Sequence, residues 1–233
     1  MKRIISLSLF LIIINTNTFS QRIIENELFT VVYSEAYQQP LVLTYEYPIF
    51  RELKLKELHY TTEYIGKIPV TYPEAITKTT EFKVPTGIIT SDDKDYYKNE
   101  YDKGHLVPKK FFEDNKENQN FLWSYLNCAL MHETLNSGVW RVLEDYERSL
   151  YQEQNVRVKI ILSFSDDSNI TQGGATIPTH FTKIIEYGFS SYITNNEEIT
   201  REVYTFPNDS SVKGKKIEEF KIAHLSGKFI TNE

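Results

Sequence analysis

The residues of this chain that could do chemistry gather in two short segments. The first, YDKGHLVPKKFF, places an acid, a base, a glycine and an imidazole in succession at Asp102, Lys103, Gly104 and His105. A neutral imidazole is a suitable general base for activating water, and a glycine beside it permits a close approach of other backbone. Taken singly, each of the five histidines is more often structural than catalytic. His105 differs because two charged residues, Asp102 and Lys103, lie close to it in the sequence.

The second segment, LNSGVWRVLEDYER, offers oxygen donors on what the spacing predicts to be a helix. Asn136 and, two turns later, Glu144 lie on its polar face. An amide oxygen and a carboxylate are hard ligands that suit Mg²⁺ better than zinc. The sequence has no CxxC and no Cys/His zinc pattern. A neutral imidazole beside such a metal is a suitable general base for activating water.

A long helix from His132 onwards must position the second segment. Thr134 is its expected cap. Its expected core stripe recurs at spacings of three and four and consists of Leu135, Val139, Val142, Leu143 and Tyr146. The strong helix therefore presents its polar residues on the opposite face.

The remaining elements are mostly strands. The runs FTVVY and LVLTYEY around a polar turn predict a hairpin, and VRVKIILSF, IPTHFTKIIEYGF and REVYTF predict three further strands. Residues 50–82 show no clean period and predict irregular structure, while KKIEEFKIAHL near the end predicts a terminal helix. Strands and helices do not alternate regularly, so an α+β domain is favoured over a doubly wound sheet.

With these motifs in place, the chain resembles the DNA/RNA non-specific endonucleases of the ββα-metal, or His-Me finger, group, which includes mitochondrial endonuclease G. DKGHLVP followed by LNSGVWRVLEDYER is similar to the family pattern Asp-Arg-Gly-His, an Asn-containing strand, and Leu-Asn-x-x-x-Trp-x-x-Leu-Glu. IPTHFTKII, YTFPN and LSGKFI resemble flanking family segments, so the likeness covers nearly all of the chain after its first residues. It implies a mixed, mainly antiparallel central sheet with a ββα-metal finger and flanking helices.

The resemblance also implies roles for individual residues. His105 matches the base that takes a proton from the attacking water, Asn136 the direct metal ligand, and Glu144 a carboxylate that holds metal-bound waters. Asn127 matches an asparagine that supports the site from the finger's second strand. Arg148 matches an arginine near the substrate phosphates, although an ordinary surface pair with Glu144 explains it equally well. Asp102 and Lys103 complete the implied site.

The reaction implied is hydrolysis of DNA and RNA phosphodiesters with little base specificity, leaving a 5′-phosphate and a 3′-hydroxyl. The implied cofactor is Mg²⁺, with Mn²⁺ as an alternative. The oligomeric state stays open, and a homodimer is one option.

Some positions depart from the family pattern. Lys103 stands where arginine is usual, and lysine lacks the planar two-point grip on phosphate. An expected upstream arginine is absent, and Lys83, Lys94 and Lys98 are the cations found instead. Leu130-Met131 stands where the family usually has Pro-Gln. The next residue, His132, is expected at the surface. Trp140 is expected to pack in the core and His180 to be structural, while Lys109 and Lys110 either line the approach to phosphate or solvate the loop.

The beginning of the chain predicts export. Lys2 and Arg3 precede an apolar run too short to span a bilayer comfortably, so residues 1–20 are expected to be a signal peptide and 21–233 a single nuclease domain, secreted or periplasmic. An uncleaved anchor is the alternative; after cleavage no stable membrane association is expected. The single cysteine, Cys128, excludes an intramolecular disulfide.

The overall charge weighs against a broad basic binding face. The formal net charge is −6, which is the wrong sign for a protein that grips nucleic acid over a wide surface. An inactive member of the family that serves as a binding module is therefore the competing hypothesis. A secreted toxin with a partner inhibitor is a third, although no delivery domain is attached.

Overall fold

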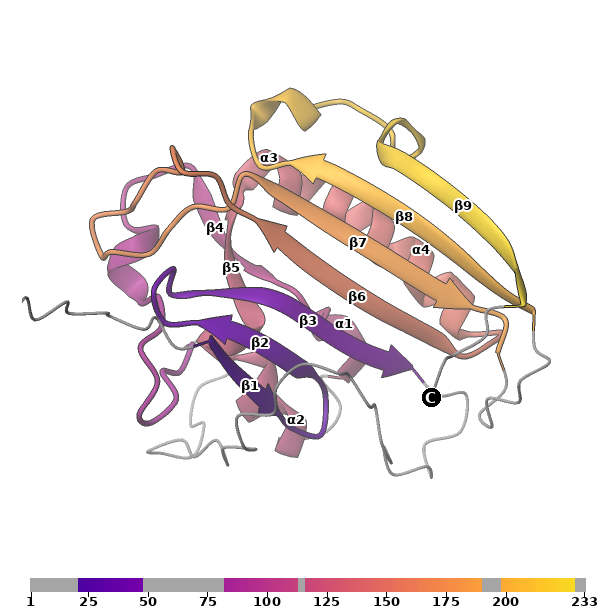
Figure 1. Ribbon diagram of the computed structural model, residues 1–233, viewed down its shortest axis with the longest axis horizontal. Coiled ribbons are helices and arrows are strands. Elements are labelled where there is room, and N and C mark those ends of the chain that lie inside the picture. Colours follow the sequence, from indigo (N-terminus) through magenta and orange to yellow (C-terminus); the bar gives the residue numbers. More distant parts are fainter. Residues whose placement is uncertain (1–20, 48–81, 113–115, 190–197, 229–233) are drawn as a thin grey trace, which may run out of the picture.

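The computed structural model describes residues 21–47, 82–112, 116–189 and 198–228, and its largest element is a seven-stranded sheet (Figure 1). The strands lie in the order β1-β2-β3-β6-β7-β8-β9, and each is antiparallel to its neighbours. Their bounds are β1 (Gln21–Glu25), β2 (Thr30–Ser34), β3 (Gln39–Tyr47), β6 (Val156–Ser163), β7 (His180–Tyr187), β8 (Glu198–Pro207) and β9 (Lys221–Lys228).

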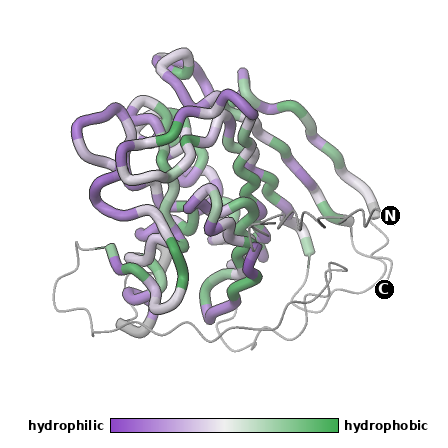
Figure 2. The backbone as a smooth tube through the Cα atoms, turned by 60° about the vertical axis from the view of Figure 1, so that its left-hand side comes forward, coloured by the Kyte–Doolittle hydropathy of each residue, from purple (hydrophilic) through white to green (hydrophobic). Residues whose placement is uncertain are grey.

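The strands of the sheet follow from alternation of apolar and polar residues. In β6 every second residue, starting with Val156, is buried, and Figure 2 shows hydrophobic and hydrophilic residues alternating along strands of the sheet. The predicted hairpin is confirmed as β2 and β3, and the three later strands are confirmed as β6, β7 and β8. Strand β1 was not expected from the sequence.

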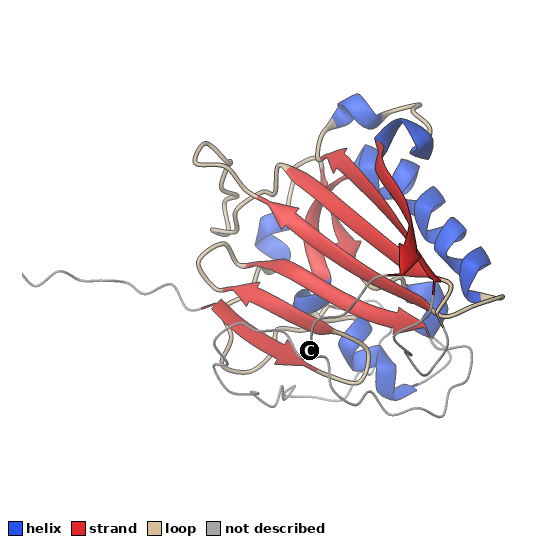
Figure 3. Ribbon diagram, turned by 45° about the vertical axis from the view of Figure 1, so that its right-hand side comes forward, coloured by secondary structure: helices blue, strands red, loops and turns tan. Residues whose placement is uncertain are grey.

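A second layer covers one face of the sheet (Figures 1 and 3). It contains a two-stranded sheet of β4 (Tyr101–His105) and β5 (Cys128–His132), followed by α3 (Glu133–Leu135), the π turn η3 (Asn136–Trp140) and α4 (Arg141–Tyr151). Between the two strands lie α1 (Lys109–Phe112), α2 (Lys116–Leu122) and the 3₁₀ turn η2 (Tyr125–Asn127). Two strands followed by a helix form the predicted finger, and the α+β class is confirmed.

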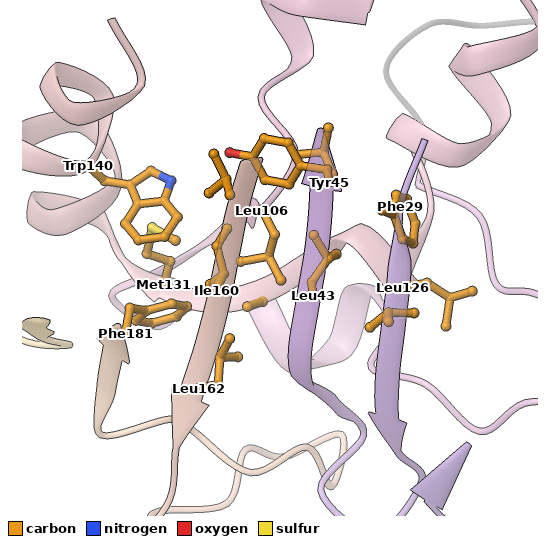
Figure 4. Close-up of a cluster of buried hydrophobic side chains, with 14 of the residues drawn as sticks. Phe29, Leu43, Tyr45, Leu106, Leu126, Met131, Trp140, Ile160, Leu162 and Phe181 are labelled. Atoms are coloured by element: carbon orange, nitrogen blue, oxygen red, sulfur yellow. The ribbon is translucent and has the colours of Figure 1, made fainter. Parts of the chain in front are cut away.

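The hydrophobic core lies between the two layers (Figure 4). Leu43 and Ile160 project from the sheet, while Trp140 and Met131 come from the finger. The Trp140 ring packs edge-on against Phe181, with 5.6 Å between ring centroids. The core therefore fixes the finger, and with it the candidate site, against a rigid sheet.

The C-terminal prediction was wrong. The segment expected to be helical forms a short 3₁₀ turn, η5 (Ile217–Phe220), and then the edge strand β9. Phe220 packs against Phe206, with 4.9 Å between ring centroids, and β9 pairs with β8. Pairing satisfies backbone groups along the edge of β8, which a helix could not do.

The strong helix is present but differs from the prediction in three ways. The imidazole of His132, not Thr134, is the cap, because its Nδ1 accepts a hydrogen bond from the Thr134 amide at 3.2 Å. The π turn η3 interrupts the helix at Gly138. This wider turn changes the rotation of the residues after it, so Leu143 is buried while Val142 is 49% exposed.

Several expectations fall outside the described residues. The predicted signal peptide, residues 1–20, and residues 50–81 of the region expected to be irregular are among them. None of the described helices is long and apolar enough to cross a membrane.

Candidate active site

The finger strands are held in register by Asn127, the last residue of η2. Its side chain is buried; Oδ1 accepts a hydrogen bond from the Val107 amide at 2.7 Å, and Nδ2 donates to the carbonyls of Val107 and Leu122. Its own carbonyl accepts from the Leu106 amide at 3.1 Å. These contacts tie the loop that follows His105 to the start of β5. Asn127 therefore has the contacts of a residue that positions the base.

Gly104 is required by the close approach of the two finger strands. It pairs with Ala129, and a Cβ atom at position 104 would lie 2.6 Å from Cβ of Met131. Only glycine fits without moving β5. The glycine before the histidine thus serves the packing of the finger.

His105 ends β4 and is enclosed by aromatic side chains. Its ring lies 5.0 Å from the ring of Phe82 and 5.1 Å from that of Trp123, between centroids. Burial, with a smaller contribution from the positive charge of Lys109, lowers the pKa of His105 to about 4. Its Nε2 atom is buried and has no hydrogen-bond partner among the described residues. His105 is thus a neutral imidazole with a nitrogen free to accept a proton.

Asp102 connects the first finger strand to the helix. Its Oδ2 accepts a hydrogen bond from Nδ2 of Asn136 at 2.9 Å. Because the amide nitrogen is used in this way, the amide oxygen of Asn136 is the atom left to bind a cation. The described contacts of His105 do not include Asn136, so a substrate and its water would have to bridge base and ligand.

Glu144 lies on α4, two turns beyond Asn136, and is partly buried. Burial raises the pKa of Glu144 to about 7; Lys183 opposes this rise and Glu147 adds to it. A divalent cation nearby would favour the carboxylate form, as it does for metal ligands generally.

The donor set fits a hard cation. Within the described ranges, no three His, Cys, Asp or Glu side chains converge as a metal site. The candidate donors are therefore the amide oxygen of Asn136 and the carboxylate of Glu144, two turns further along the helix. Oxygen donors completed by water match the preference of Mg²⁺.

Lys103 is partly exposed, with 28% of its side chain accessible, but its charge is already paired. Its ammonium forms an ion pair with Asp93 and lies 5.3, 5.7 and 5.4 Å from the ring centroids of Phe82, Tyr96 and Tyr125. The hydrogen bond from Lys103, together with one from Tyr125, lowers the pKa of Asp93. Lys103 therefore lies near His105, since both side chains lie close to the ring of Phe82.

Arg148 and His132 also differ from their expected surroundings. The partner of Arg148 is Asp145, whose Oδ1 accepts from Nη2 at 2.7 Å, and not Glu144. His132, expected at the surface, is 5% exposed and caps the helix. His180, at the start of β7, is exposed.

A buried ion pair behind α4 was not anticipated. Lys183 on β7 and Glu147 on α4 are both fully buried, and Lys183 Nζ lies 2.6 Å from Glu147 Oε1. The hydroxyl of Tyr45 donates to Glu147 Oε2 at 2.8 Å, and Lys183 Nζ lies 4.0 Å from the centroid of the Trp140 ring. A lysine inside the run FTKII is the signal that could have revealed it, because an unpaired lysine is not tolerated in a core.

A sheet backed by a finger that carries an imidazole, an amide and a carboxylate in this order defines the class of ββα-metal nucleases. The chain matches the DNA/RNA non-specific endonuclease family over residues 11–230, and it belongs to that family. It is a nuclease and therefore a hydrolase.

Solved structures support the same fold. The chain is similar to the one in a structure titled "Crystal structure of the EndoG/EndoGI complex: Mechanism of EndoG inhibition", with a TM-score of 0.62 and 18% identity. The match covers 88% of this chain and 81% of that one. No curated protein matches the sequence.

Proposed function

We propose that the chain is an exported, Mg²⁺-dependent endonuclease that cleaves both DNA and RNA, with Mn²⁺ as an alternative ion. The observation that carries this proposal is the finger itself. It places a neutral imidazole at the end of β4 and hydrogen-bonds the amide of Asn136 to Asp102, so that an amide oxygen is left for the cation.

In the proposed reaction, His105 accepts a proton from water as the water oxygen bonds to phosphorus. The bond from phosphorus to O3′ breaks, and the leaving oxygen takes a proton from solvent. When bound, the divalent ion supplies Lewis-acid stabilisation of charge on the phosphate. Asn136 and, through water, Glu144 would hold it. Asn127 keeps the loop after His105 in place.

The test is cleavage of plasmid DNA and of RNA with Mg²⁺ or EDTA. Wild type should cut both substrates with Mg²⁺ and neither with EDTA, and His105→Ala should lower the rate by about 10²–10⁴-fold. His180→Ala is the matched control, because that histidine is exposed on β7, and it should retain wild-type activity. If wild type binds DNA yet leaves it intact, the inactive binding module is the correct alternative.

Export is tested by the N-terminus of the mature protein. Expressed with its full sequence in a secreting host, the protein should be found outside the cytoplasm and begin near Gln21. Retention of residues 1–20 in a membrane fraction would support an uncleaved anchor instead.

A further inference from the structure

His132 joins the second finger strand to the helix that carries Asn136. It is the last residue of β5, and α3 begins directly after it at Glu133. Nδ1 of its imidazole accepts a hydrogen bond from the amide of Thr134 at 3.2 Å and lies 2.8 Å from the hydroxyl oxygen of the same residue. Because the first amides of a helix have no partner within the helix, an acceptor at this position orders the first turn.

The position of Asn136 depends on this first turn. The helix α3 has three residues, and the amide of Asn136 donates to the carbonyl of Glu133. The regular helix is then interrupted by the π turn η3, with non-helical backbone at Gly138. The longer α4 therefore cannot hold the first turn as part of one continuous helix, and so short a turn is not stable by itself. The cap at His132 is what fixes the backbone of Asn136, while Asp102 orients its side-chain amide.

Asn208 in turn holds His132 in place. It follows β8 and is 5% exposed, and its Oδ1 accepts a hydrogen bond from the amide of His132 at 2.7 Å. Its Nδ2 donates to the carbonyls of Leu130 and Pro178 at 2.9 and 2.8 Å, and its own amide donates to the carbonyl of Thr179 at 2.9 Å. Both polar atoms of the buried side chain are bonded, which fixes its orientation. The end of β5 is thereby attached to the large sheet.

We propose that His132 is a positioning residue for the divalent ion: its imidazole fixes the first helical turn and thereby the amide oxygen of Asn136 that would hold the cation. This inference rests on the proposed nuclease function. The other contacts of the ring are weaker. Nε2 lies 3.5 Å from a carboxylate oxygen of Glu100, whose side chain is 78% exposed, and the ring meets that of Tyr101 edge-on at 5.9 Å. An exposed ion pair contributes little to stability, so the role depends on the capping nitrogen.

Two variants that differ by one methylene group separate the two nitrogens of the imidazole. Asparagine has Oδ1 where histidine has Nδ1, so His132→Asn keeps the capping acceptor and loses the contact with Glu100. Glutamine has its polar atoms near the position of Nε2, so His132→Gln does the reverse. Hydrogen–deuterium exchange over residues 133–139 would be measured without metal or nucleic acid. Cleavage of a short DNA duplex would be measured over a range of Mg²⁺ concentrations.

His132→Gln should speed amide exchange in the first turn about 3–30-fold, as expected for loss of a helix cap. It should also raise the Mg²⁺ concentration for half-maximal cleavage by about tenfold, because a partner that orients a metal ligand is lost. Its kcat at saturating Mg²⁺ should stay within about threefold of wild type, since the proposed base is unchanged. His132→Asn should stay within about threefold of wild type in all three measurements, because asparagine is a favoured cap.

The outcomes separate this inference from the function on which it rests. If wild type cleaves and His132→Gln keeps the wild-type dependence on Mg²⁺, the positioning role is wrong and the nuclease function stands. This holds even if amide exchange becomes faster, because the cap then supports only the fold. The proposal is also overturned if His132→Asn is impaired as much as His132→Gln, or if His132→Gln fails to fold. If wild type does not cleave at all, both proposals fail.

Discussion

At the scale of single residues, the low pKa of His105, the proposed base, should set the acidic limit of activity. Because its pKa is about 4, below the usual 6.5, the base is neutral and ready to accept a proton at any pH above about 5. We expect kcat/KM, measured with saturating Mg²⁺, to hold its maximum down to about pH 5.5. The pH–rate profile from pH 4.5 to 8 checks this.

Saturating metal is needed in that experiment because protonation of Glu144 competes with the cation. The pKa of Glu144 is raised to about 7 without metal. At low Mg²⁺ the activity should therefore fall at a higher pH than at saturating Mg²⁺. An acidic limb that stays at pH 6.5 even with saturating Mg²⁺ would contradict a buried, neutral base.

Residue types and spacing predicted a set of site residues, but they could not predict what each side chain contacts. The hydrogen bond between Asp102 and Asn136 was not predicted, whereas Asn127 has the contacts expected of a residue that supports the finger. The fate of Lys103 could not be predicted, because its partner, Asp93, and the three rings around it come from segments that meet only in the folded chain. A local sequence pattern does not show which residues far apart in the sequence will come into contact.

At the scale of elements, the ion pair between Lys183 and Glu147 fixes α4 against the sheet. Lys183→Met should lower the free energy of unfolding by about 3–5 kcal/mol, because it leaves the carboxylate of Glu147 buried without its partner. Urea denaturation at pH 7 measures the loss. The loss of stability should be accompanied by local unfolding of α4. Because α4 carries Glu144, the cleavage rate should then respond less to Mg²⁺.

The double variant Lys183→Met/Glu147→Leu is the control for this prediction. Replacing both charges by apolar side chains removes the unpaired ion, so most of the lost stability should return. If the double variant is less stable than Lys183→Met alone, the pair is not the source of the loss.

A second polar cluster joins β8 to the edge strand β9. Glu202 is 3% exposed and accepts hydrogen bonds from Lys221 Nζ at 2.9 Å and Tyr204 Oη at 2.8 Å, and lies 3.0 Å from His224 Nδ1. Burial alone would raise the pKa of Glu202, but these three partners hold it below the usual 4.5. A carboxylate whose pKa is lowered by folding stabilises the folded state. This stabilisation is complete at pH values above the pKa of the unfolded state, near 4.5, and it is lost as the pH falls through the pKa of the folded state.

Glu202→Gln should therefore lower the free energy of unfolding at pH 7 by about 1–3 kcal/mol. The difference from wild type should shrink as pH falls below about 4.5, where Glu202 itself becomes protonated. Urea denaturation at pH 7, 5 and 3.5 measures it. A difference that is constant over this range would show that the charge of Glu202 does not stabilise the fold.

The elements themselves were predictable where a residue pattern had one reading. Alternation along Val156–Ser163 gave β6 correctly, and the three-and-four spacing gave α4. The same spacing misled at KKIEEFKIAHL, because Ile217, Phe220 and their neighbours suit a helix locally. The segment instead forms a strand because it pairs with the edge of β8. That pairing cannot be read from the segment alone, because β8 lies outside it. Similarly, the π turn at Gly138 moved Val142 out of the core stripe.

At the scale of the whole molecule, the two faces of the sheet have different roles. The finger and helices cover one face (Figure 3). The other face carries charges that pair across neighbouring strands: Arg157 binds Glu46 and lies 3.6 Å from Glu186, and Arg201 donates to Glu186 at 2.7 Å. These arginines are neutralised within the protein, so this part of the sheet does not present a basic face to nucleic acid.

The net charge of −6 and this internal pairing together predict a weak salt dependence of binding. Each phosphate that a protein neutralises on duplex DNA steepens the plot of log K against log salt by about −0.9. The slope should lie between about −1 and −3. Anisotropy of a short duplex in EDTA, from about 50 to 300 mM KCl, measures it. A wild-type slope near −6 or steeper would contradict this prediction, because it would require a broad cationic surface that binds many phosphates.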